Sequence, residues 1–85
     1  MAIVTMRYWA AAKDAAGVPE QRVTADTLAA ALAAVTGPED RARLRAVVAR
    51  SSFLIDGTPV GRQAADAVQL RDGNVIEVLP PFAGG

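Results

Sequence analysis

Apolar and polar residues alternate near both ends of the chain. This period of two is typical of strands that bury one face, and it spans residues 3–8 and 75–79. The positions expected to point inward are Val4, Met6, Tyr8, Ile76 and Val78. Residues 20–24 and 52–55 are two further expected strands, the first of them an edge strand that returns beside residues 3–8.

Between these strands the apolar residues follow helical spacing. Residues 10–16 are rich in alanine and stop at Gly17, which predicts a short helix with a glycine cap. A second helix over 26–35, with Asp26 as its N-cap, carries an apolar stripe of Leu28, Ala31, Leu32 and Val35. A third is expected to begin at Pro38 and to bury Leu44, Val47 and Val48.

Strands at both ends with helices between them predict a single α+β domain, in which one sheet wraps a helical layer. We expect this domain to span residues 1–79, followed by a flexible tail over residues 80–85. The residues expected to be buried are Val4, Met6, Leu28, Leu32, Leu44, Val48, Phe53, Ile55, Ile76 and Val78.

Composition narrows the possible chemistry. The 85 residues contain nine basic and nine acidic side chains, so no broad electrostatic surface for nucleic acid or an anionic membrane is expected, and a protein partner is favoured. Cysteine and histidine are both absent, which excludes thiolate nucleophiles, disulfides and imidazole bases. Without a signal-like N-terminal region or a long apolar run, we expect the protein to be cytoplasmic.

The residue types of the last six positions are not those expected in a packed domain. Pro80-Pro81 stiffens the exit from the last expected strand, and Gly84-Gly85 then removes every side chain. The motifs that accompany this ending are Met6-Arg7-Tyr8-Trp9, Ala12 to Gly17, Leu54 to Gly57 and Asp72 to Gly85. Together they resemble the MoaD/ThiS sulfur carriers over essentially the whole chain. Pro-Pro ahead of Gly-Gly is most similar to the small subunit of molybdopterin synthase.

The resemblance implies a ubiquitin-like β-grasp fold, with a mixed sheet of four to five strands packed on one or two helices. It implies that a ubiquitin-activating-like adenylyltransferase uses ATP to adenylate Gly85, and that a persulfide donor converts this residue to a thiocarboxylate. Gly84 would let the tail enter a narrow partner channel. Sulfur would then reach a pterin precursor in the large synthase subunit, and the chain itself would bind no cofactor or metal.

Strand periodicity also predicts a docking surface. If Tyr8 points inward, Trp9 falls on the outer face, where Leu79 of the parallel last strand would lie beside it. The alternative is that Trp9 covers the first helix as part of the core. The residues expected to bind the partner are Trp9, Pro59, Val60, Leu79, Pro80, Pro81 and Phe82.

Other functions fit the same residues. The chain could carry sulfur for thiamine, cysteine or another sulfur metabolite. It could instead be a ubiquitin-like modifier, with Gly85 joined to lysines of target proteins, or a passive β-grasp interaction module. Arg41, Arg43, Arg45 and Arg50 could form a basic patch, although a solvated helix surface is favoured for them.

Overall fold

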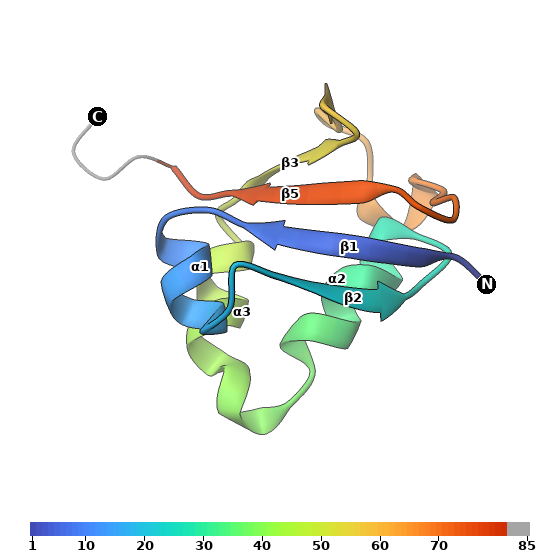
Figure 1. The fold of residues 1–85 in the computed structure, drawn as a ribbon. Coiled ribbons are helices and arrows are strands. Elements are labelled where there is room, and N and C mark those ends of the chain that lie inside the picture. The colour runs from blue at the N-terminus through green and yellow to red at the C-terminus, as the bar shows by residue number, and fades with distance from the viewer. Residues whose placement is uncertain (82–85) are drawn as a thin grey trace.

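The computed structural model describes residues 1–81, which form one five-stranded sheet with its helices on one side (Figure 1). The strand order across the sheet is β2-β1-β5-β3-β4. The elements in chain order are β1 (Ile3–Tyr8), α1 (Ala11–Ala16), β2 (Glu20–Thr24), α2 (Leu28–Thr36), η1 (Glu39–Arg41), α3 (Ala42–Val48), β3 (Ser52–Ile55), β4 (Thr58–Pro59), η2 (Ala65–Ala67) and β5 (Val75–Leu79).

The sheet is mixed, because β1 and β5 are parallel and the other pairs are antiparallel. The first and last strands are therefore neighbours at the centre of the sheet, as expected, and β2 is an edge strand. Asp56 and Gly57, with φ angles of 49° and 83°, form the tight turn between β3 and β4. This arrangement is the predicted β-grasp fold.

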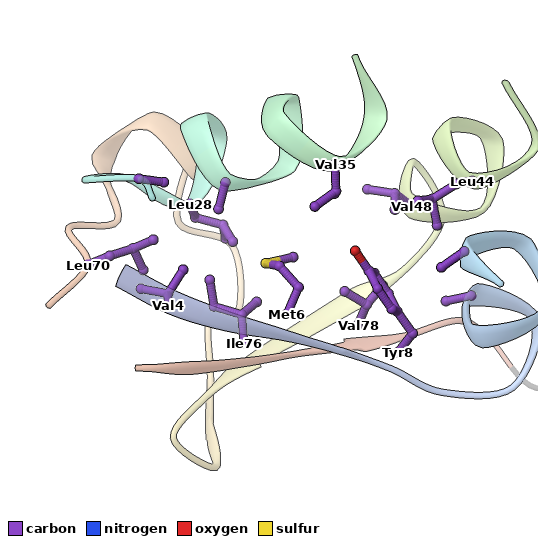
Figure 2. Close-up of a cluster of buried hydrophobic side chains, with 14 of the residues drawn as sticks. Val4, Met6, Tyr8, Leu28, Val35, Leu44, Val48, Leu70, Ile76 and Val78 are labelled. Carbon is purple, nitrogen blue, oxygen red and sulfur yellow. The ribbon is translucent and has the colours of Figure 1, made fainter. Parts of the chain in front are cut away.

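The core lies between the sheet and the helices (Figure 2). The expected burial is confirmed for Val4, Met6, Leu28, Leu44, Val48, Ile76 and Val78. Three other predicted core residues, Leu32, Phe53 and Ile55, are only partly buried and pack against its margin. Phe53 and Ile55 lie on β3, which has only the two-residue β4 beyond it, so the sheet gives them incomplete cover.

The helices differ from the prediction at their ends. Asp26 was expected to cap α2, but the cap is Thr27, whose hydroxyl accepts a hydrogen bond from the Ala30 amide at 3.1 Å. The Asp26 carboxylate instead accepts a hydrogen bond from the Ala2 amide at 3.0 Å. Within residues 1–81 the sheet packs on three α-helices, as the helical spacing in the sequence predicted, and no helix is long and apolar enough to cross a bilayer.

Tyr8 carries a buried hydroxyl that makes the fold sensitive to alkaline pH. The side chain is 2% exposed, and its hydroxyl donates a hydrogen bond to Gln21 Oε1 at 2.9 Å. Burial raises the pKa of Tyr8 from 10.0 to about 12, while the nearby Arg41 charge partly offsets this shift. Only the neutral phenol is therefore well accommodated in the folded state.

We expect this burial to destabilise the protein above pH 10. Because the pKa is higher in the folded than in the unfolded state, the contribution is fully present below pH 10 and is lost as pH rises towards 12. The loss should approach about 2–3 kcal/mol in the free energy of unfolding. Urea denaturation between pH 9 and 12 measures it, with Tyr8→Phe as the control that cannot ionise. Equal losses in the two proteins would contradict this assignment.

Candidate functional site

The outer face of the sheet, which the helices leave uncovered, has an apolar region where β5 ends. Trp9 is 47% exposed there, Leu79 and Pro80 are half-buried, and Pro81 is exposed. We call this region the tail-root patch, and its members are Trp9, Leu54, Pro59, Leu79, Pro80 and Pro81. Because β5 ends at Leu79, the patch includes the residues at which the chain leaves the sheet.

Trp9 is held on the outer face by its backbone and its indole. Its backbone N–H donates to the Val78 carbonyl at 3.3 Å, and its indole Nε1–H donates to Glu77 Oε1 at 3.1 Å. The prediction that Trp9 lies outside is confirmed, and the alternative placement in the core is wrong. Both bonds join the end of β1 to β5 just before the tail.

The turn after Trp9 has a conformation that is costly for a residue with a Cβ. Ala10 has φ 49° and ψ −124°, and the Ala12 amide closes the turn with a hydrogen bond to the Trp9 carbonyl at 3.0 Å. A non-glycine residue in this region costs of the order of 1–3 kcal/mol. The rest of the fold therefore maintains this turn, which sets the direction in which Trp9 leaves β1.

Two opposite charges beside the patch do not pair with each other. Arg7 and Glu77 occupy opposing positions on β1 and β5. However, Arg7 Nε pairs with Glu20 on the other side, at 3.3 Å. Glu77 is consequently available to accept the Trp9 indole.

Prediction from the sequence was wrong for one residue near the patch and missed another. Val60 was expected in the exposed patch, but it is 8% exposed and belongs to the core, because its backbone bonds to Phe53 and turns the side chain inward. Leu54 was missed. It is half-buried and lies between Glu77 and Pro59 in the sheet register. Strict alternation in 52–55, with Phe53 and Ile55 inward, would have placed it on the outer face.

The remaining predicted site residues, Phe82, Gly84 and Gly85, lie outside the described residues. Across residues 1–81, no group of three His, Cys, Asp or Glu side chains is placed to hold a metal ion. A cavity of about 310 Å³ lies beside β3 and β4. It is lined by Ser52, Phe53, Pro59, Gln63 and other residues that carry no ionisable side chain.

Comparison with solved structures shows the same fold in several proteins. The small archaeal modifier protein 1 from Methanosarcina acetivorans superposes with a TM-score of 0.84 at 24% identity, covering 100% of this chain and 98% of that one. Molybdopterin-converting factor from Helicobacter pylori 26695, solved as a complex of subunits 1 and 2, gives 0.72 at 22% identity, covering 98% and 99%. The thiamine biosynthesis protein ThiS from Geobacter metallireducens gives 0.53 at 19%, covering 95% and 99%.

Sequence comparison defines the family. No curated protein matches the chain significantly. The model of the ThiS family, by contrast, matches residues 6–85, which include the second half of β1, the tail-root patch and both terminal glycines. This match and the β-grasp architecture agree over nearly the whole chain, and the protein belongs to the ThiS family.

Proposed function

We propose that the protein carries sulfur for molybdopterin synthesis as a thiocarboxylate on Gly85. The observation that carries this proposal is the family match, which extends through both glycines that follow β5. Pro80-Pro81 favours the molybdopterin branch over the thiamine branch. The chain supplies the reacting carboxylate and a docking surface, and its partners supply the catalytic groups.

The chemistry of the terminus explains why an activating enzyme is needed. A terminal carboxyl has a pKa of about 3.3–3.7, so it is an unreactive anion at neutral pH. The proposed adenylyltransferase joins one carboxylate oxygen to the α-phosphorus of ATP, and pyrophosphate leaves. Sulfide, or the terminal sulfur of a persulfide, attacks the acyl carbon, and AMP leaves. With a persulfide, a thiol then cleaves the acyl disulfide and releases the thiocarboxylate.

The tail-root patch provides a docking surface for the two proposed partners, the adenylyltransferase and the large synthase subunit. The Helicobacter pylori protein of the same fold was solved with its second subunit, which supports a partner of this kind here. Trp9 is the largest exposed aromatic side chain of the described part of the chain, and such residues often contribute most of the binding energy of an interface. The backbone and the indole of Trp9 both bond to β5, so the proposed docking residue is attached to the strand that leads into the tail.

We expect Trp9→Ala and Leu79→Ala each to weaken binding to the large synthase subunit by more than about 1 kcal/mol. Isothermal titration calorimetry measures the affinity, and circular dichroism checks that the fold is kept. The matched control is Ile3→Ala, since Ile3 is 53% exposed at the opposite end of β1. Equal effects of Ile3→Ala and Trp9→Ala, or unchanged binding in both patch variants, would contradict the role of the patch.

Reconstitution tests which pathway uses the sulfur. Thiocarboxylated protein is mixed with the large synthase subunit from the same organism and a pterin precursor. Molybdopterin should form while the thiocarboxylate is consumed. Consumption by a thiazole synthase but not by the large synthase subunit would overturn the molybdopterin assignment.

The ubiquitin-like modifier is the second candidate, because the fold matches small archaeal modifier protein 1 with a TM-score of 0.84. This function uses the same activated terminus but ends in an isopeptide bond to a lysine. Peptide mapping of proteins from the native host distinguishes the two functions. A carrier yields free chain ending in a thiocarboxylate, whereas a modifier yields Gly85 attached to lysines of other proteins.

A further inference from the structure

The two edges of the sheet differ in the number of backbone groups that are free to pair with another strand. The β4 edge has only two residues, and one of them is Pro59, which has no N–H to donate. The β2 edge runs for five residues, and within residues 1–81 no strand pairs with its far side. An open edge of this length is a template for strand addition.

The register with β1 identifies the free backbone groups of β2. The Ala25 amide donates to the Ala2 carbonyl at 2.8 Å, and the Tyr8 amide donates to the Pro19 carbonyl at 2.9 Å. Since hydrogen-bonded pairs alternate in an antiparallel ladder, the amides and carbonyls of residues 21 and 23 face β1. Those of Glu20, Arg22 and Thr24 therefore point away from the sheet.

We propose that this edge pairs with the same edge of a second copy of the chain, antiparallel and with Gln21 opposite Gln21. In this register Glu20 of each copy forms a hydrogen-bonded pair with Arg22 of the other. Both side chains are exposed on the outer face, so opposite charges lie directly across the new junction. A shift of one residue in each copy would instead place Arg22 opposite Arg22.

Val18 adds a second complementary feature. It is an exposed apolar residue, 39% accessible, two positions before β2 begins. The proposed register places it opposite Thr24 of the other copy. The charge pattern and this apolar position thus favour the same alignment, which joins the two sheets into one continuous sheet.

The dimer leaves the tail-root patch open. In an antiparallel pair the twofold axis is perpendicular to the sheet, so the outer faces of both copies lie on the same side. β1 separates the β2 edge from β5, so both tails would leave from strands away from the junction. The dimer is therefore independent of the proposed sulfur-carrier function.

Sedimentation equilibrium of the full chain over a concentration series tests the proposal. The wild type should show a reversible monomer–dimer equilibrium that weakens with salt. Arg22→Glu and Glu20→Arg each place like charges across the junction, and each should raise the dimer dissociation constant at least about tenfold. An equimolar mixture of the two variants restores opposite charges at every pair and should dimerise again.

Two further variants test the backbone pairing of the edge and the location of the charge effect. Arg22→Pro removes an outward N–H without disturbing the ladder to β1, and it should abolish the dimer while circular dichroism stays unchanged. Arg43→Glu makes the same charge change on the exposed side of α3 and should leave the equilibrium as in the wild type. A wild type that remains monomeric throughout, a folded Arg22→Pro variant that dimerises normally, or a mixture that fails to associate would overturn the proposal.

Discussion

Deleting Gly85, or adding one residue after it, should abolish adenylation and sulfur transfer without a measurable change in folding stability. The proposed chemistry takes place at a carboxylate that a partner enzyme must bind in one position. A displacement of about 1 Å can already cost around a hundredfold in rate, and one residue moves the carboxylate by more than this. Intact-mass analysis after incubation with ATP, the activating enzyme and sulfide measures the transfer.

A variant at Gly84 and a variant at the N-terminus test whether this loss of sulfur transfer is specific to the C-terminal tail. Gly84→Ala adds a methyl group that restricts the backbone and widens the tail, so sulfur gain should be slower than in the wild type. One extra residue before Met1 is the control, because it changes the length of the chain but leaves the tail unaltered, and sulfur gain should be normal. An extended tail that still gains sulfur at its new end would contradict the assignment of Gly85.

Leu28→Ala should lower the free energy of unfolding by about 2–5 kcal/mol, the usual cost of truncating a buried leucine. Leu28 is 1% exposed and lies between α2 and the centre of the sheet, as Figure 2 shows. Leu32, one turn later on the same helix, is only partly buried. Leu32→Ala should therefore cost less than half as much, since less contact is lost and solvent can fill the space.

Urea denaturation gives both values, and an unchanged m-value in each variant shows that the two-state comparison holds. The same pair of variants should bind the large synthase subunit as the wild type does, because neither side chain reaches the outer face. If Leu32→Ala were as costly as Leu28→Ala, the packing of α2 described above would be wrong.

Residues that follow a regular period were the most predictable part of the fold. The alternation in β1 and β5 identified Met6 and Ile76 as inward-facing, and both are 0% exposed. The cap of α2 was less predictable, because Asp26 and Thr27 are adjacent and both residue types cap helices well. Asp26 is instead engaged by the Ala2 amide, 24 residues away, and no local rule anticipates that contact.

The candidate site was predictable to the same extent. The period of β1 predicted Trp9 on the outer face, and the parallel pairing of β1 with β5 was also expected. Register does not determine side-chain direction, so the bonds from Arg7 to Glu20 and from Trp9 to Glu77 emerged only from the structure. Val60 was misplaced because β4 is too short to carry a period, and a tertiary hydrogen bond to Phe53 orients that residue.

Mass spectrometry of the wild-type chain tests the central claim most directly. The protein is incubated with ATP, the proposed activating enzyme from the same organism and a sulfide source, then analysed intact and after proteolysis. The account predicts a gain equal to one oxygen-to-sulfur exchange, localised to Gly85. A chain that gains no sulfur from an activating enzyme shown to be competent, or that carries the sulfur at another residue, would contradict the sulfur-carrier assignment.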